Sequence, residues 1–367
     1  MAQCKIKWLI GLLAVLGVSL CGVAQGEISP PGAAHTKAAP SLADFWNGNA
    51  TWVSDSNNIG SSFGFHCLST IKNGSEIWAY YINNYSSPKG SIKSATGRAR
   101  STDGLNWIND GIVMDGGAPV RPNIRQDKVS VVEGQSPYWD DRLATFPGIW
   151  KDGRTWYLVY EGAAEDIPYS PGDIGLATST DGKIFTKHPK NPILRHNTTG
   201  WEKVNIGTPS LYKENGTWYL FYHGFDGDFC RIGVATGTSL TNLTKNSGNP
   251  IIDVAAGTTA WDCGSAGKRT VVKEGSYYYV AYEGSTRQPY DQAKWSSGMA
   301  RSTNLFNWIK FPGNPVIPQT TSGFGFDATE IIQINGTWFM YVRTSDSTAP
   351  TKRFRLAATP PTVTTKP

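Results

Sequence analysis

The chain has 367 residues, enough for one large domain or two ordinary ones. Only 17% of the residues are charged, whereas glycine (40 residues), tyrosine (16) and tryptophan (14) are abundant. This composition favours a β-rich fold with tight turns and excludes a helical bundle or a disordered chain. The formal net charge is +5 and the sequence contains no run of basic residues, so nucleic acid is not an expected partner.

The N-terminus has the pattern of a signal peptide. Lys5 and Lys7 precede an apolar run over residues 8–20, and small residues follow at positions 22–24. Because the run is short for a membrane span, we predict a signal peptide over residues 1–24. We therefore expect a secreted protein, extracellular or periplasmic, without stable membrane insertion. A short membrane anchor is the alternative.

Two segments are predicted to flank a single domain. Residues 25–45 are rich in proline, alanine and serine and show no periodicity, which predicts a linker. Residues 360–367 are rich in proline and threonine, which predicts a flexible tail. The domain between them spans residues 46–359.

A repeated hairpin is the main signal in this domain. Five alternating apolar strings contain a glycine turn: KNGSEIWAYY, KDGRTWYLVY, ENGTWYLFY, EGSYYYVAY and INGTWFMYV, with the turns at Gly74, Gly153, Gly216, Gly275 and Gly336. Asn-Gly or Asp-Gly between such strings is the strongest short-range hairpin signal. Successive turns are 79, 63, 59 and 61 residues apart, which indicates a repeat rather than isolated hairpins.

Each repeat contains further strand signals after its hairpin. A second string follows, as in GRARSTDGLNW from Gly97 and GLATSTDGKIF from Gly175. In three units an Asn-Pro turn then ends the outer strand, at Asn191, Asn249 and Asn314. Each unit thus predicts four antiparallel strands. Because one such sheet cannot bury both of its faces alone, we predict an all-β, five-bladed β-propeller.

The N-terminal strand is predicted to close the ring. The fifth unit ends after its third strand, near Thr359. The string ATWVSD from Ala50 resembles the outer strings NWIND from Asn106 and NWIKF from Asn307. We therefore predict that this strand completes the last blade, which leaves no unpaired edge at the seam.

The ends of the predicted strands place many polar residues on one side of the ring. In a propeller, the loops entering the first strand and leaving the second strand of every blade meet around the axis. Here these places hold carboxylates, two histidines, arginines and tryptophans. Carboxylates can protonate a leaving oxygen or activate water, and flat rings stack on sugars. The pattern therefore predicts a carbohydrate pocket at the axis.

The sequence resembles the five-bladed propeller glycosidases, the grouping around glycoside hydrolase families 43, 32, 62, 117 and 130. The resemblance spans residues 46–359 and rests on the repeat, on strings such as GTPSLYKENGTWYLFYHG and on the Asn-Pro turns. It implies a secreted, family 43-like glycoside hydrolase. Such an enzyme would hydrolyse O-glycosidic bonds of a polysaccharide or oligosaccharide by carboxylate acid/base catalysis.

The residues of this chain depart from the family 43 pattern. Family 43 enzymes use an Asp base, a second Asp that tunes its neighbours and a Glu acid. Matched by distance to the hairpin turn, the family's acid falls at Gly207 and an Asp falls at Phe146. Neither position holds a carboxylate, so the family's triad does not carry over as it stands.

We therefore expect the catalytic acids to have moved to other loops. Asp327 stands where the pattern requires an acid and is the expected general base or nucleophile. Glu161 or Glu283 is the expected general acid, and Asp262 would tune its neighbours. The expected substrate-binding residues are His66, Arg142, Asp141, Glu202, His223, Trp261, Arg269 and Glu330.

Two other functions remain open at this point. One is a non-catalytic carbohydrate-binding propeller, and the other is a metal-assisted hydrolase or lyase that uses His66, His223 and a nearby Asp. No cofactor motif occurs in the sequence, so we expect no cofactor, and a carbohydrate substrate is the expected partner. Cys230 and Cys263 are expected to form a disulfide because neighbouring blades bring their loops together, whereas Cys67 is expected to be a buried apolar residue.

Overall fold

The computed structural model describes residues 38–56, 59–86, 92–117, 139–164, 172–287, 292–319, 325–344 and 351–360. The chain divides into two units, Met1–Ala38 and Ala39–Pro367, and all described residues but the first belong to the second unit. The predicted signal peptide and most of the predicted linker and tail lie outside the described residues. Within the described ranges, no helix is long and apolar enough to cross a membrane.

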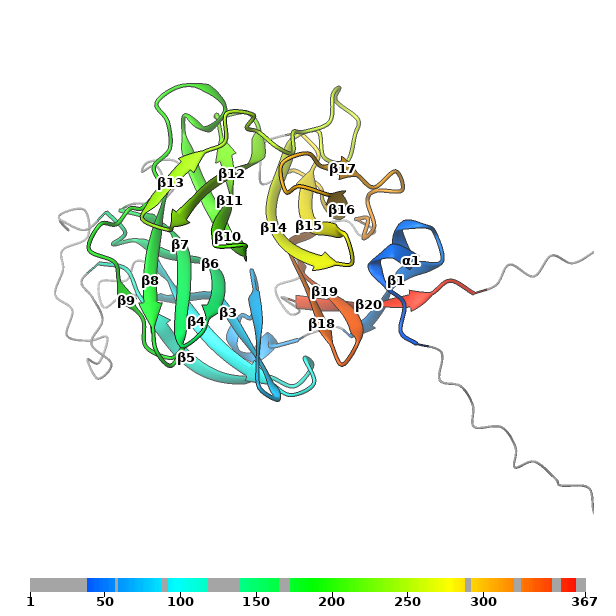
Figure 1. Cartoon of the computed structure of the whole chain (residues 1–367), viewed down its shortest axis with the longest axis horizontal. Coiled ribbons are helices and arrows are strands. Elements are labelled where there is room, and N and C mark those ends of the chain that lie inside the picture. Colours follow the sequence, from blue (N-terminus) through cyan, green and yellow to red (C-terminus); the bar gives the residue numbers. More distant parts are fainter. Residues whose placement is uncertain are drawn as a thin grey trace, which may run out of the picture. The chain divides into compact units, whose positions relative to one another are not determined.

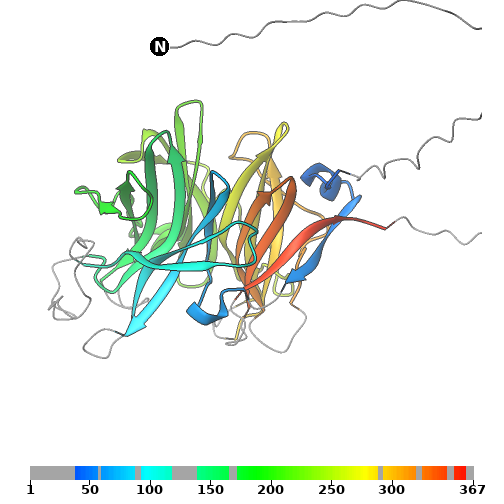
Figure 2. The same cartoon turned by 90° about the horizontal axis from the view of Figure 1, so that it is seen from below.

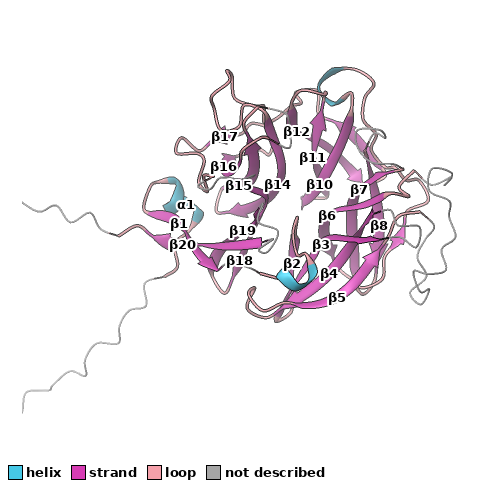
Figure 3. Cartoon of the chain, turned by 180° about the vertical axis from the view of Figure 1, so that it is seen from behind, coloured by secondary structure: helices cyan, strands magenta, loops and turns pink. Residues whose placement is uncertain are grey.

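The second unit is all-β, with its strands in curled, mostly antiparallel sheets (Figure 1, Figure 3). Two successive meanders form the first sheet. Their strands are β2 (Ser69–Asn73), β3 (Glu76–Ser86), β4 (Ile92–Ser101) and β5 (Ile108–Met114), then β6 (Leu143–Asp152), β7 (Thr155–Ala163), β8 (Asp173–Ser179) and β9 (Thr186–Lys187). A parallel pair, Ser94 with Leu143, joins β4 to β6.

Two further meanders form the second sheet in the same way. Their strands are β10 (Asn205–Glu214), β11 (Thr217–Phe225), β12 (Cys230–Ser239) and β13 (Asn242–Lys245), then β14 (Ser265–Glu274), β15 (Tyr277–Ser285), β16 (Trp295–Ser302) and β17 (Ile309–Lys310). Here the parallel pair that joins the meanders is Cys230 with Ser265, between β12 and β14.

The third sheet brings the two ends of the unit together. It contains β18 (Phe326–Ile334), β19 (Thr337–Thr344), β20 (Thr351–Ala358) and β1 (Ala50–Ser56). β1 pairs antiparallel with β20, and Trp52 lies opposite Leu356. The first and last strands of the unit are therefore neighbours, as the blue and red strands of Figure 2 show.

A short helix, α1 (Leu42–Trp46), lies in the stretch that the sequence predicted as linker. Its N-cap Ser41 and the Asp44 side chain form a reciprocal capping box, which satisfies the first backbone N–H groups. Leu42 and Phe45 are buried, so apolar burial holds this turn against the sheet despite the Pro/Ala/Ser-rich surroundings. Single 3₁₀ turns lie at Ser61–Phe63 and Gly200–Glu202.

The glycine turns lie between paired strands, as expected. In the β10–β11 hairpin, Glu214 lies opposite Thr217, and the two residues between them have positive φ angles, 49° at Asn215 and 79° at Gly216. Two successive left-handed residues match the twist of the flanking strands, which is why Asn-Gly occurs there. The turn thereby brings the second strand of each meander back beside the first.

Three of the meanders contain the same buried polar cluster, which we call the acid–tyrosine clamp. In one, Trp261 packs on Tyr282 with ring centroids 5.5 Å apart, and Asp262 accepts hydrogen bonds from the Tyr282 hydroxyl at 3.2 Å and from Lys310 at 2.6 Å. Asn314 also contacts the Tyr282 hydroxyl. The equivalent sets are Trp139, Asp140, Tyr160, Lys187 and Asn191, and Trp201, Glu202, Tyr222, Lys245 and Asn249. Each clamp satisfies a buried tyrosine hydroxyl, which would otherwise be costly to bury.

Replacement of Trp52 tests the contribution of β1. Trp52 is 7% exposed and packs in the same apolar cluster as Leu356 and Met340. We expect Trp52→Ala to lower the free energy of unfolding by about 3–5 kcal/mol, the usual cost of deleting a large core side chain. Urea denaturation measures this change. Thr51→Ala, at an exposed position of the same strand, is the control and should change it by less than about 0.5 kcal/mol; equal effects of the two variants would contradict the packing role of β1.

Candidate active site

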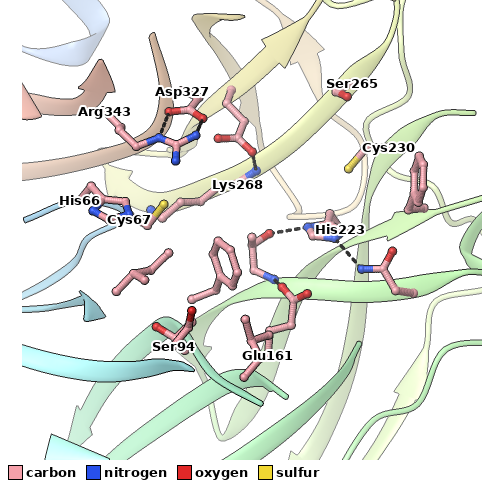
Figure 4. A pocket seen from close by; sticks show the side chains of 18 of the residues that line it. His66, Cys67, Ser94, Glu161, His223, Cys230, Ser265, Lys268, Asp327 and Arg343 are labelled. Atoms are coloured by element: carbon pink, nitrogen blue, oxygen red, sulfur yellow. Dashed lines mark hydrogen bonds and ion pairs between the residues drawn. The ribbon is translucent and has the colours of Figure 1, made fainter. Parts of the chain in front are cut away.

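A cavity of about 590 Å³ is lined by residues from all of the meanders. Five of the predicted site residues line it: Asp327, Glu161, Glu283, His66 and His223. The other predicted site residues do not: Asp262, Arg142, Asp141, Glu202, Trp261, Arg269 and Glu330. In the view of Figure 4, Glu161 and Asp327 lie on opposite sides of the cavity, with Lys268 between them.

Other lining residues were not among those predicted from the sequence. They include Lys268, Thr208, Arg343, Cys67, Cys230 and Trp295. Cys67, Thr208 and Lys268 share a signal that could have found them, since each lies at a similar distance before the hairpin glycine of its repeat. Phe146 lies seven residues before Gly153, and Gly207 lies one residue before Thr208, so residues in this part of the repeat are candidates for the cavity, whatever their type.

The first strands reach the cavity through a β-bulge. The pairing register shifts between Thr145 and Gly148 in β6, and between Gly207 and Ser210 in β10. Phe146 (52°) and Thr208 (41°) lie within these shifts and have a positive φ, as does Cys67 (51°) in the segment just before β2. A left-handed conformation is rare for a β-branched residue such as Thr208, and bulges redirect side chains and backbone groups near functional sites.

Glu161 on β7 is the carboxylate most strongly shaped by its surroundings. Its side chain is 1% exposed, and its Oε2 accepts the backbone N–H of Thr208 at 2.9 Å. The carboxylate fills the space beside Gly207, where an added Cβ would lie 1.9 Å from Oε2. Burial raises the pKa of Glu161 to about 7, although the Thr208 N–H and the Arg269 charge both lower it. Glu161 can therefore carry a proton close to neutral pH.

Glu283 on β15 is held in a similar way. Its Oε1 accepts the backbone N–H of Lys268 at 2.8 Å. A Cβ on Gly267 would lie 2.4 Å from the same oxygen, so this glycine also makes room for a carboxylate. The two glutamates come from the same Tyr-Glu-Gly string of two different repeats.

Asp327 on β18 lies against a cation. The Arg343 guanidinium binds it in a bidentate manner, with Nε 2.7 Å from Oδ1 and Nη2 on Oδ2. Such a pair fixes the orientation of the carboxylate and is stronger than a neutral hydrogen bond. Asp327 is thus a positioned carboxylate whose two oxygens both contact Arg343.

The two cavity histidines are both disposed to be neutral. His223 Nδ1 lies 2.7 Å from the Thr208 hydroxyl and its Nε2 lies 3.3 Å from the Asn205 amide. Burial, followed by the Arg269 charge, lowers the pKa of His223 to about 3. Burial and then Arg343 lower the pKa of His66, whose Nδ1 contacts the Gly64 carbonyl at 2.5 Å. Both rings can exchange hydrogen bonds with a neutral ligand.

Several predicted site residues instead hold the framework together. Asp262 and Trp261 belong to one acid–tyrosine clamp and Glu202 to another. Asp141 pairs with Lys93 at 3.0 Å. The sequence places all of these at strand entrances, but their side chains are directed to partners within the sheets rather than to the cavity.

Arg269 and Glu330 lie beneath the cavity-lining residues. Arg269 binds the carbonyl and the hydroxyl of Thr208 and thereby supports the bulge that contacts Glu161. Burial lowers the pKa of Arg269 to about 10. Glu330 accepts the Thr70 backbone N–H at 2.7 Å and lies 3.3 Å from Lys268 Nζ, so it links three meanders. The Arg142 carbonyl accepts the Ser94 N–H, and the Arg142 N–H donates to the Ala163 carbonyl.

The cysteines do not form the expected bridge. Cys230 and Cys263 are free thiols, as is Cys67. The β12–β14 ladder brings Cys230 opposite Ser265 rather than opposite Cys263, which is why proximity of the loops did not produce a bond. Burial raises the pKa of Cys67 to about 12, so this thiol is protonated. Among the described residues, no group of three or more His, Cys, Asp or Glu side chains is arranged to hold a metal ion.

Comparison with solved structures identifies the fold. BT0996, in a complex with RGII, has a TM-score of 0.62 at 18% identity, over 85% of this chain and 91% of its own. A thermostable family-43 glycoside hydrolase has a TM-score of 0.59 at 17% identity, over 85% and 98%. Zg3597, a family 117 glycoside hydrolase from the marine bacterium Zobellia galactanivorans, has a TM-score of 0.56 at 12% identity, over 84% and 90%.

These likenesses confirm the resemblance inferred from the sequence. The matches are glycoside hydrolases of families 43, 117 and 32, which are five-bladed β-propeller families. At such low identities they establish the fold of this chain and not its reaction. No protein-family model and no curated protein matches the sequence.

Replacement of Asp262 separates a framework role from a role in the cavity. Asp262→Ala would leave the buried Tyr282 hydroxyl and the Lys310 ammonium without this partner. Because Lys310 is one third exposed, we expect a loss of about 2–3 kcal/mol in the free energy of unfolding, below the value for a fully buried pair. Urea denaturation measures the loss. Asp228→Ala, at an exposed position, is the control, and an equally small change in both variants would show that the clamp does not stabilise the fold.

Proposed function

We propose that this protein is a secreted glycoside hydrolase that cleaves O-glycosidic bonds of a polysaccharide or oligosaccharide by carboxylate acid/base catalysis. The observation that carries the proposal is Glu161, a cavity carboxylate whose pKa burial raises to about 7. A carboxylic acid that keeps its proton near neutral pH is what a glycosidase needs to protonate the leaving oxygen. The N-terminal targeting pattern supports secretion.

We infer that the meanders are the blades of a five-bladed propeller and that β1 closes the ring. The proposal is supported by the pairing of β1 with β20, which supplies the fourth strand of the last meander. It is also supported by the likeness to families that have this architecture. The cavity would then lie on the propeller axis, where residues from every blade meet.

The position of Glu161 supports a relocated general acid of a family 43-like enzyme. By the resemblance, the acid of family 43 falls at Gly207, which has no side chain. The Glu161 carboxylate, carried by the neighbouring β7, occupies the side-chain space of Gly207. The acid group therefore reaches the same place from a different strand. The Thr208 N–H holds it there, and the glycine is required for it to fit.

The rest of the cavity supports binding of a sugar. Phe146, Phe225 and Trp295 offer flat apolar surfaces. Asn205 and neutral His223 can exchange hydrogen bonds with hydroxyl groups. Aromatic faces together with a few directed polar groups are the usual composition of a carbohydrate-binding pocket.

A non-catalytic carbohydrate-binding propeller remains the alternative. It is favoured by the bidentate pairing of Asp327 with Arg343, which engages one of the three cavity carboxylates. It predicts that the protein binds oligosaccharides without cleaving any of them. Turnover of any substrate in a panel of aryl glycosides and oligosaccharides would decide against it.

Replacement of Glu161 tests the assignment of the general acid. Glu161→Ala should lower kcat by about 10²–10⁴-fold on an oligosaccharide, whose leaving group needs a proton. It should change kcat little on a 2,4-dinitrophenyl glycoside, whose leaving group does not. Because the acid must be protonated, wild-type kcat/KM should be present below pH 7 and fall as the pH rises through about 7. Glu161→Gln should lack this fall.

Steady-state kinetics on the two substrate classes measure both effects. Asp228→Asn, which changes an exposed carboxylate, is the control and should behave as wild type. Equal losses on activated and unactivated substrates would remove Glu161 from the role of acid.

Replacement of Gly207 by alanine also tests the placement of the Glu161 carboxylate, because it fills the space that the carboxylate occupies. In Gly207→Ala the new Cβ would lie 1.9 Å from Glu161 Oε2, so the carboxylate must move away from residue 207. We expect oligosaccharide kcat to fall by at least about tenfold with a smaller change on the dinitrophenyl substrate, because a misplaced acid donates its proton poorly. The control is Gly248→Ala, where the added Cβ meets only the Asn246 side chain at 3.0 Å. Unchanged kinetics in Gly207→Ala would contradict the placement of the acid.

A further inference from the structure

Among the described residues, three carboxylates line the cavity, and two of them are held in the same way. Glu161 and Glu283 stand at the same position of two repeats, follow a buried tyrosine and precede a glycine. Each carboxylate is seated in space left by a glycine on a first strand and accepts the N–H of the next residue, Thr208 or Lys268. Two equivalent seats for a carboxylate in one cavity indicate a working pair rather than a single acid.

The two glutamates also act on common neighbours. Cys230 lies in the cavity wall, and burial, followed by the charges of Glu283 and Glu161, raises the pKa of its thiol. The buried Arg269 likewise faces both carboxylates. Burial raises the pKa of the Cys67 thiol, and of the charged groups around it Arg343 lowers this pKa while Asp327 and Glu283 raise it. Glu283 therefore acts on the same cavity-wall thiol as Glu161, Cys230, and on the same thiol as Asp327, Cys67.

The third carboxylate, Asp327, is bound by a cation rather than by a backbone N–H. Both oxygens of Asp327 accept charged hydrogen bonds from Arg343. To take a proton from water, Asp327 would have to weaken this bidentate pair, which is roughly twice as strong as neutral hydrogen bonds. Glu283 shares the arrangement of Glu161: its Oε1 accepts the Lys268 backbone N–H, and both glutamates face the Arg269 charge.

We propose that Glu283, and not Asp327, is the general base of the glycoside hydrolysis, and that the Asp327–Arg343 pair binds the sugar. This inference rests on the proposed function. In the reaction R–O–R′ + H₂O → R–OH + HO–R′, Glu161 gives its proton to the leaving oxygen as the anomeric C–O bond breaks. A water oxygen bonds to the anomeric carbon and transfers one proton to Glu283, so one proton leaves the first carboxyl and one arrives at the second.

The Asp327–Arg343 pair then has a separate task. A rigid pair of opposite charges offers acceptors and donors to vicinal sugar hydroxyls without changing its own protonation state. Its removal should weaken substrate binding in the ground state and the transition state alike, which raises KM more than it lowers kcat. This expectation distinguishes the pair from a base, whose loss lowers kcat.

The experiment compares Glu283→Ala, Glu283→Gln, Asp327→Asn and Asp327→Ala with wild type on an activated aryl glycoside that the wild type cleaves. We expect both Glu283 variants to lose about 10²–10⁴-fold in kcat even with the activated leaving group, in contrast to Glu161→Ala. Sodium azide should partly restore Glu283→Ala by replacing the activated water, with a glycosyl azide as product. Asp327→Asn should raise KM at least tenfold and keep kcat within about tenfold.

Thermal unfolding of each variant, together with the isosteric Glu283→Gln, separates loss of the base from loss of the fold. Wild-type kcat for both Glu283 variants, or azide rescue of Asp327→Ala with none of Glu283→Ala, would overturn this inference. If the wild type cleaves no member of the substrate panel, the proposed function itself fails, and that outcome is distinct from either result with the variants.

Discussion

The chemistry of the cavity depends on the β-bulge in the first strands. At β10 the bulge holds Thr208 in a left-handed conformation and directs its backbone N–H at the Glu161 carboxylate. At β14 the N–H of Lys268 contacts Glu283 in the same manner. A regular ladder would have used these N–H groups to pair with the neighbouring strand. The bulges are locally strained, but the N–H groups that they free orient two carboxylates. Arg269 stabilises the β10 bulge by binding Thr208.

The Tyr-Glu-Gly string shows how one short sequence serves two purposes. Successive side chains of a strand point to opposite faces. Tyr282 joins the acid–tyrosine clamp, and Gly284 leaves room for the clamp tryptophan, with an added Cβ 2.4 Å from the Trp261 ring. Glu283 between them points to the other face and reaches the cavity. The clamps thus fix the backbone of the strand, and the strand presents the glutamate from a rigid base.

Much of the fold and part of the site were predictable from the sequence because both depend on local patterns. The hairpin glycines and the alternation of side chains located the paired strands and brought Glu161, Glu283 and Asp327 to one cavity. The sequence could not separate Asp262 from these acids, because a clamp depends on a tyrosine and a lysine distant in the chain. The spacing of the repeat could have located Thr208, but not the bulge that turns its backbone N–H toward Glu161, since a bulge is a property of strand pairing and leaves little trace in composition.

The absence of a carboxylate at Gly207 supports a relocated acid better than it supports a missing one. If the cavity had no use for an acid there, any small side chain would serve, and the buried Glu161 would be a costly choice beside it. Instead, the only residue type without a Cβ stands where a Cβ would strike the Glu161 oxygen, and Gly267 stands in the same relation to Glu283. Each buried carboxylate has a specific binding place, which consists of the space left by a glycine and a backbone N–H of the bulge. Because a fold alone does not specify a reaction, these two seats carry the functional argument for this chain.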